Sequence, residues 1–72
     1  MLRRISDLDE RIDTGEVVEW QSPDGVRYRY ERTGRRVGVE MPVGRWEWLA
    51  EGVSDKRSAK RIVFAAINED EL

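Results

Sequence analysis

The chain has 72 residues and a formal net charge of −2, and it contains no cysteine and no histidine. Its length is that of one small domain spanning residues 1–72, which buries only about 60% of its unfolded surface. The composition excludes disulfides and the thiolate or imidazole ligands of zinc sites, and we expect no cofactor. No apolar run approaches the roughly 18 residues of a membrane span, and the N-terminus lacks the apolar core of a signal peptide. We therefore expect a soluble cytoplasmic protein without a membrane partner.

A short helix is predicted for residues 1–15. Ser6 suits the N-cap, and Gly15 suits the position just after the last turn. The apolar stripe consists of Ile5, Leu8 and Ile12. The polar face carries four acids, Asp7, Asp9, Glu10 and Asp13. These acids could hold Mg²⁺, but a solvent-exposed acidic face is the simpler interpretation. A helix this short must dock on another element to be stable.

Residues 16–21 are predicted to form the first strand, followed by a turn at residues 22–25 (Ser-Pro-Asp-Gly). Proline suits the second position of a type I turn, and the glycine that follows can take a positive φ. A loop of residues 23–25 sets Ser22 opposite Val26. The register then pairs Trp20 with Tyr28, Val18 with Tyr30 and Glu19 with Arg29.

The stretch 26–41, VRYRYERTGRRVGVEM, alternates apolar and polar residues on both sides of Thr33-Gly34, which is typical of a half-buried hairpin. A two-residue loop pairs Tyr30 with Val37, Tyr28 with Val39, Val26 with Met41, Glu31 with Arg36 and Arg27 with Glu40. A three-residue loop with Gly34 in a bulge suits the turn chemistry better but mixes the two faces. Because a slip of one residue exchanges the faces, we prefer the first register.

Residues 45–49, RWEWL, fit either a fourth strand or a single helical turn that ends at Gly52. The strand register pairs Trp46 with Met41, Trp48 with Val39 and Glu47 with Glu40. Both indole rings then lie in the core, whereas the two glutamates repel each other. We favour the strand because its aromatic residues alternate.

A helix is predicted from about residue 55 to residue 68, capped by Ser54 or Asp55. Its apolar stripe consists of Ala59, Ile62, Val63, Ala66 and Ile67. This stripe should cover the aromatic face of the sheet. The predicted fold is α+β: a short N-terminal helix, a three- or four-stranded antiparallel β-meander, and a C-terminal helix packed on one sheet face.

Two basic blocks are candidates for contacts with a partner. The candidate residues are Arg32, Arg35, Arg36, Arg57, Lys60, Arg61 and Phe64. At the hairpin tip Arg32 faces Arg35 without an acid, whereas the other hairpin arginines have cross-strand glutamates and could form a self-neutralised ladder. Phe64 lies among the basic helix residues, where it is either a contact residue or covered by the N-terminal helix.

We do not expect an enzyme, because the common catalytic residues His and Cys are missing and no glycine-rich phosphate loop occurs. The first hypothesis is a small protein-binding module, such as a regulator or a phage- or plasmid-type inhibitor of a larger complex. The alternative is nucleic-acid binding through both basic blocks, which requires that they lie on one side of the molecule. The low isoelectric point, about 5.1, counts against the alternative. A homodimer is compatible with both.

Overall fold

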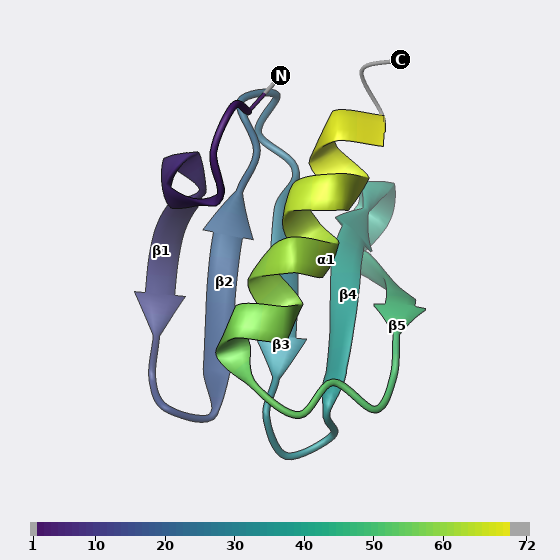
Figure 1. The fold of residues 1–72 in the computed structure, drawn as a ribbon. Coiled ribbons are helices and arrows are strands. Elements are labelled where there is room, and N and C mark those ends of the chain that lie inside the picture. Colours follow the sequence, from purple (N-terminus) through teal and green to yellow (C-terminus); the bar gives the residue numbers. More distant parts are fainter. Residues whose placement is uncertain (1, 70–72) are drawn as a thin grey trace.

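The computed structural model describes residues 2–69, except for the side chain of Val43. Over these residues the fold is α+β: five antiparallel strands form one sheet in chain order, and a helix crosses one face of it (Figure 1). The strands are β1 (Asp9–Asp13), β2 (Val17–Gln21), β3 (Arg27–Glu31), β4 (Arg36–Met41) and β5 (Arg45–Ala50). The helix is α1 (Lys56–Glu69), and the short 3₁₀ turns are η1 (Ile5–Asp7) and η2 (Pro42–Gly44). The predicted number of three or four strands was too low.

The first segment differs most from the sequence prediction. In place of a helix over residues 1–15, the chain forms η1 and then β1, which pairs with β2. Leu8 still enters the core, but Ile12 is 41% exposed, so the predicted apolar stripe does not form one face. Gly15 has a φ of 90° and lies in the β1–β2 turn instead of following a helix. Pairing with β2 gives the backbone the hydrogen-bond partners and the support that a short helix lacks in water.

The β2–β3 and β3–β4 hairpins have the predicted registers. The observed pairs include Trp20 with Tyr28, Val18 with Tyr30, Glu19 with Arg29, Tyr30 with Val37, Tyr28 with Val39 and Glu31 with Arg36. In the first turn Gly25 takes a φ of 88°, and its N–H donates to the Ser22 carbonyl at 2.9 Å. In the second, the Arg35 N–H donates to the Arg32 carbonyl at 3.3 Å. The hydrophobic alternation therefore outweighs the turn preference at this hairpin.

The strand interpretation of residues 45–49 is confirmed, but its predicted register is wrong by one residue. The observed pairs are Trp46 with Glu40, Trp48 with Gly38 and Glu47 with Val39. Because side chains alternate along a strand, this slip moves both tryptophans out of the predicted core and onto the opposite face. The observed register also separates Glu47 from Glu40. The turn η2 and an irregularity between Val37 and Gly38 accommodate the change.

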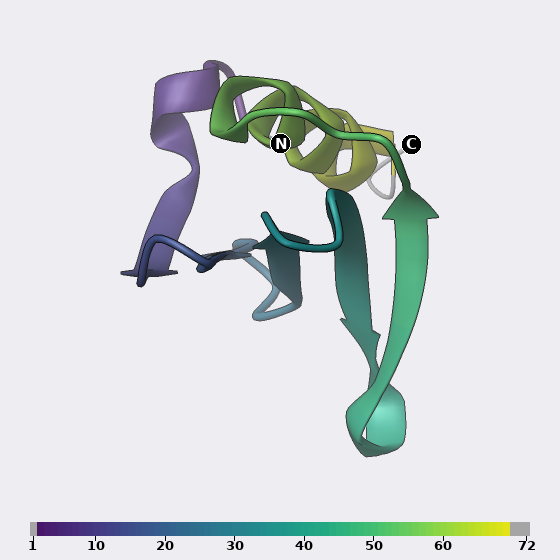
Figure 2. The same ribbon diagram turned by 90° about the horizontal axis from the view of Figure 1, so that it is seen from below.

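The core lies between the sheet and α1, which covers a single face of the sheet (Figure 2). Its buried members are Leu8, Val18, Trp20, Tyr28, Tyr30, Val37, Val53, Ala59, Val63 and Ile67. The N-terminus of α1 is capped as predicted, since the Ser58 N–H donates to Asp55 Oδ1 at 2.7 Å. The Tyr30 hydroxyl donates to the Val53 carbonyl at 3.0 Å and fastens the segment before α1 to the sheet. Within residues 2–69, no helix has the length and apolarity needed to cross a membrane.

Candidate functional site

The sheet face turned away from α1 carries alternate residues of β2, β3, β4 and β5, and we call it the outer face (Figure 2). Its charged and aromatic members and its glycine are Glu19, Arg27, Arg29, Glu31, Arg36, Gly38, Glu40, Trp46 and Trp48, and Val17 and Gln21 of β2 lie on the same face. Three arginines, three glutamates and two tryptophans therefore share one surface. Both tryptophans are half-buried, so part of each residue is open to solvent.

Trp48 lies directly over Gly38. A Cβ atom at Gly38 would come within 2.8 and 2.9 Å of two ring carbons of Trp48, closer than real side chains approach each other. The guanidinium carbon of Arg36 lies 3.7 Å from the centre of the Trp48 ring, which is a cation–π arrangement. A glycine inside a strand often marks such a close approach. Gly38 leaves space on β4 for the Trp48 ring, and Arg36 stacks on that ring, so these two residues together fix the position of the indole.

Arg29 connects Trp46 to a buried carboxylate. Its guanidinium carbon lies 4.3 Å from the centre of the Trp46 ring. The same guanidinium donates from Nε and Nη2 to Glu19 Oε2 at 3.1 and 2.8 Å. Glu19 is only 5% exposed, so its charge depends on this partner and on Arg27, whose Nη1 lies 3.8 Å from Glu19 Oε1. Arg29 thus links β2, β3 and β5 through one side chain.

The charges of the outer face balance each other. Arg36 Nε donates to Glu31 Oε1 at 2.9 Å, and Arg27 forms an ion pair with Glu40. The hydrogen bond from Arg27 lowers the pKa of Glu40, and the nearby arginine charges act in the same direction. Because each arginine has a glutamate partner, the outer face carries no net formal charge.

The two arginines at the tip of the β3–β4 hairpin have different surroundings. Arg32 Nη1 lies 3.4 Å from Asp13 Oδ1 and also donates to the Gly15 carbonyl, so the expectation of a tip without an acid was wrong for this residue. Arg35 is exposed and has a φ of 52°. Its carbonyl accepts a hydrogen bond from the Val53 N–H at 2.8 Å. The tip therefore lies beside the segment that leads into α1.

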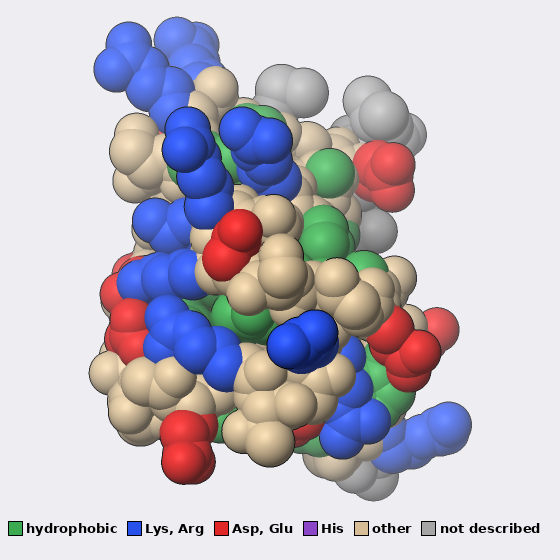
Figure 3. All heavy atoms as spheres, turned by 60° about the horizontal axis from the view of Figure 1, so that its bottom comes forward, with side chains coloured by type: hydrophobic (Ala, Val, Ile, Leu, Met, Phe, Trp, Pro, Cys, Tyr) green, Lys and Arg blue, Asp and Glu red, His purple; other side chains and the backbone are tan. Residues whose placement is uncertain are grey.

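The helix carries the other basic block on its solvent side. Arg57 and Arg61 are exposed, and Lys60 is half-buried. Hydrogen bonds from Ser58 lower the pKa of Asp55, and the charges of these two arginines add to the effect. Phe64 is half-buried and packs against the core. Figure 3, which looks toward the hairpin tip and α1, shows Lys and Arg side chains gathered on this side of the molecule.

Two of the N-terminal acids bind α1. Lys56 Nζ lies 2.8 Å from Glu10 Oε1 and 2.9 Å from Asp13 Oδ2, and these contacts raise the pKa of Lys56. The hydrogen bond from Lys56, followed by the bond from the Gly15 N–H, lowers the pKa of Asp13 to about 2. Within the described part of the chain, no group of three or more His, Cys, Asp or Glu side chains is arranged to hold a metal ion.

Of the seven candidate residues, only Arg36 belongs to the outer face. Sequence reasoning placed Trp46 and Trp48 in the core and so missed the aromatic part of this surface. The signal was Gly38, a glycine in the middle of an otherwise regular strand, which should have been matched with a large neighbour. Comparisons with protein-family models, curated proteins and solved structures find nothing similar to this chain.

Proposed function

We propose that this protein is a small non-enzymatic binding module that recognises another protein through its outer face. The observation that carries the proposal is the pair of indole rings, Trp46 and Trp48, each held under a guanidinium group on an uncovered sheet face. Tryptophan and arginine are enriched among the residues that dominate protein–protein binding energy. Their positions here are set before binding, which reduces the entropy lost when a complex forms.

The charge balance of the outer face supports a protein partner over a phosphate backbone. Each of its arginines already pairs with a glutamate, at 2.8 Å for Arg29 with Glu19 and 2.9 Å for Arg36 with Glu31. A nucleic acid would have to displace these carboxylates or approach them against repulsion. A protein surface of mixed polarity can add contacts to the tryptophans and leave the ion pairs intact.

The tryptophans and arginines of the outer face are residue types that dominate contacts between proteins. We therefore favour a role in the cytoplasm as a regulator or inhibitor of a larger complex, in which the outer face provides the contact.

Nucleic-acid binding is the second candidate, and one observation favours it. The Val53 N–H donates to the Arg35 carbonyl at 2.8 Å, so the hairpin tip and the start of the basic helix lie together. Arg35, Arg57 and Arg61 could follow a phosphate backbone from there. However, two other basic residues of this region already form ion pairs within the chain. Arg32 pairs with Asp13, and Lys56 pairs with Glu10 and Asp13.

The first experiment is an affinity pull-down from the source cells with the tagged protein, Trp46→Ala and Arg57→Ala. Trp46→Ala removes an outer-face ring, whereas Arg57→Ala changes the helix on the other side of the molecule. We expect Trp46→Ala to lose the bound protein and Arg57→Ala to retain it, with similar circular dichroism spectra for all three. Equal recovery by Trp46→Ala, or loss with Arg57→Ala alone, would contradict the proposal.

The second experiment tests the alternative by fluorescence anisotropy of labelled single- and double-stranded oligonucleotides at about 50 and 200 mM salt. Binding that weakens steeply with salt and is reduced by Arg35→Ala and Arg57→Ala would favour nucleic acid. Absence of binding at the lower salt concentration would eliminate it.

A further inference from the structure

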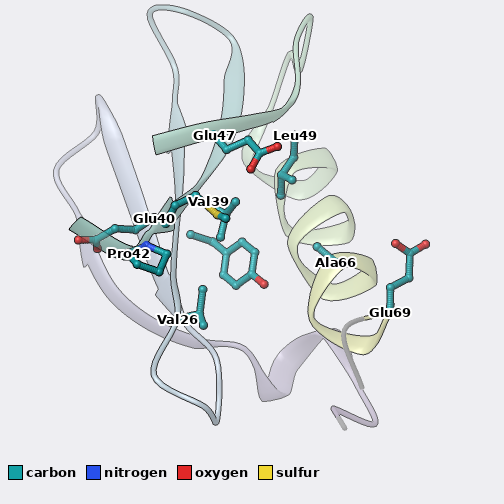
Figure 4. A pocket seen from close by; sticks show the side chains of 10 residues that line it. Val26, Val39, Glu40, Pro42, Glu47, Leu49, Ala66 and Glu69 are labelled. Carbon is teal, nitrogen blue, oxygen red and sulfur yellow. The ribbon is translucent and has the colours of Figure 1, made fainter. Parts of the chain in front are cut away.

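A groove lies on the inner side of the sheet, between β4, β5 and the second half of α1 (Figure 4). It has a volume of about 440 Å³, which falls in the range of about 300–1,000 Å³ that is usual for ligand pockets. Its apolar lining includes Val26, Val39, Met41, Leu49 and Ala66. Leu49 and Met41 are 42% and 39% exposed, so α1 leaves this apolar surface uncovered. Exposed apolar surface in a concave site marks a candidate interaction site.

A bulge in β5 supplies one wall of the groove. Trp48 pairs with Gly38, and the next pair joins Ala50 to Val37, so Leu49 is an extra residue without a partner on β4. Ala50 packs against the core, whereas Leu49 lines the groove, as Figure 4 shows. Bulges are common at sheet edges and beside functional sites, where they redirect a side chain. The bulge thus directs two consecutive apolar residues to the inner side, one for the core and one for the groove.

Each of two walls of the groove combines an apolar residue with a glutamate. On β5, Glu47 lies two residues before Leu49. On α1, Glu69 lies three residues after Ala66 and therefore on the same side of the helix. Both glutamates are exposed, and within residues 2–69 neither forms an ion pair. The third glutamate of the lining, Glu40, already pairs with an arginine of β3.

The C-terminal end of α1 adds negative potential to the same place. α1 ends at Glu69 and has no basic residue in its last turn. The C-terminus of a helix carries a partial negative charge, equivalent to about half an elementary charge, and favours a cation nearby. Among the described residues, no Lys or Arg lines the groove. The groove therefore combines an apolar surface with two carboxylates that lack a basic partner in the described part of the chain.

We propose that the groove binds a short segment of another protein in which an apolar side chain stands between two basic residues. The apolar side chain packs between Leu49 and Ala66, and the basic side chains pair with Glu47 and Glu69. Charge complementarity selects this occupant, because the two carboxylates belong to different walls with apolar surface between them. An occupant that satisfies both carries two cationic groups and an apolar group between them. An acidic segment is repelled by the same carboxylates.

The groove and the outer face are separate surfaces. The groove lies on the side of the sheet that faces α1, and Glu40 is the one residue of the outer face that also lines it. Occupation of the groove therefore goes beyond the proposed function and does not rest on it. A partner held by Trp46 and Trp48 leaves the groove open, and a segment in the groove leaves both indole rings open.

The test is an NMR titration of the isotope-labelled protein with three capped pentapeptides. Gly-Arg-Leu-Arg-Gly has the proposed pattern, Gly-Glu-Leu-Glu-Gly reverses its charges, and Gly-Arg-Gly-Arg-Gly lacks its apolar side chain. We expect the first peptide to shift the amide signals of Leu49 and Ala66 in a saturable way. The other two should bind at least about tenfold more weakly, because each loses either the ion pairs or the apolar contact.

Two variants and a control locate the contact. Glu47→Lys reverses the charge of the β5 wall, and Leu49→Ser removes its apolar side chain. Both residues are exposed, so the variants should keep the fold, which an unchanged amide spectrum away from the groove would show. Each should weaken binding of the first peptide at least about threefold. Glu16→Lys makes the same charge reversal between β1 and β2 and should bind like the wild type.

Three outcomes would overturn the proposal. No shift with the first peptide at its highest soluble concentration would show that the groove has no affinity for this pattern. Shifts confined to the signals of Trp46 and Trp48 would assign the peptide to the outer face. Equal binding of all three peptides, or unchanged binding by Glu47→Lys and Leu49→Ser, would exclude the proposed contacts. None of these outcomes changes the pull-down with Trp46→Ala, so failure here and failure of the proposed function are distinguishable.

Discussion

The two faces of the sheet are made by alternate residues of the same strands, yet they use their side chains in different ways. The inner face buries Val18, Trp20, Tyr28 and Tyr30 against α1, and each is at most 2% exposed. The outer face leaves its tryptophans half-buried and surrounds them with ion pairs. Removal of the apolar surface of the inner face from water lowers the free energy of the folded state relative to the unfolded chain. The inner face is therefore the main source of the stability of the fold.

The outer face leaves part of its aromatic surface in solvent after folding. Tryptophan offers the largest apolar area of any side chain, and two of the three in this chain remain partly in solvent. Alternate positions of one strand thus serve the core on one face and, in the function proposed above, the contact with a partner on the other. Substitutions on the two faces should therefore separate the two properties.

The largest effect is expected on the inner face, from Tyr30→Ala. Tyr30 is 1% exposed, so removal of its ring should lower the free energy of unfolding by about 3–5 kcal/mol. A domain of this size has about that much stability in total, so the variant should be mostly unfolded. Tyr30→Phe keeps the ring and loses only the hydrogen bond to Val53, at a cost of about 1 kcal/mol. Urea titration measures both, and equal losses would show that the ring is not a core element.

The next effect lies on the outer face, at Gly38. Gly38→Val should displace the Trp48 ring, because even the Cβ atom would lie 2.8 Å from it. We expect a loss of about 1–3 kcal/mol from overpacking and a change in tryptophan fluorescence. In the double variant Gly38→Val, Trp48→Ala the collision is removed, so the cost should be less than the sum of the single costs. Strict additivity would mean that the two residues do not interact.

The two central hairpins and the helix show which parts of the fold could be predicted from the sequence. The β2–β3 hairpin was predicted correctly because two local signals agreed, the apolar alternation and the turn residues 22–25. The β3–β4 hairpin was predicted correctly because the apolar alternation was given more weight than the turn preference. The helix was correct because its stripe spans several turns and its cap, Asp55, directly precedes it. Where pattern and turn chemistry point to one answer, the register needs no tertiary information.

The errors arose where the deciding interaction lies between distant parts of the chain. In β5 both registers keep the alternation of Trp46 and Trp48, and the choice depends on the fit of one ring over Gly38. At the N-terminus, β1 forms because β2 has an open edge, which is a property of the assembled sheet. The outer face was missed for the same reason, since a shift of one residue separates a core tryptophan from a surface one.

A smaller loss is expected from Arg29→Ala. Glu19 would keep its buried carboxylate without the guanidinium that now donates at 2.8 Å, and we expect a cost of about 1–2 kcal/mol. The double variant Glu19→Leu, Arg29→Leu removes both charges and should be closer to the wild type than Arg29→Ala. Thermal and urea unfolding provide the comparison. A double variant less stable than Arg29→Ala would show that the ion pair itself stabilises the outer face.

The smallest effect concerns the rim of the inner face, where Lys56 of α1 binds Asp13 of β1. The pKa of Asp13 is about 2 in the folded protein, below its ordinary value of 3.8. The folded state therefore binds this proton less readily than the unfolded chain, so the ionised carboxylate stabilises folding above about pH 4 and loses that contribution as the pH falls through about 2.

Asp13→Asn keeps an acceptor for the Gly15 N–H but removes the charge, so it should be less stable than the wild type at neutral pH. Urea midpoints measured from neutral to acidic pH should show the difference between the two proteins shrinking as the pH approaches 2. A constant difference would mean that the charge of Asp13 contributes nothing to joining β1 and α1, and that the substitution acts through another property of the side chain.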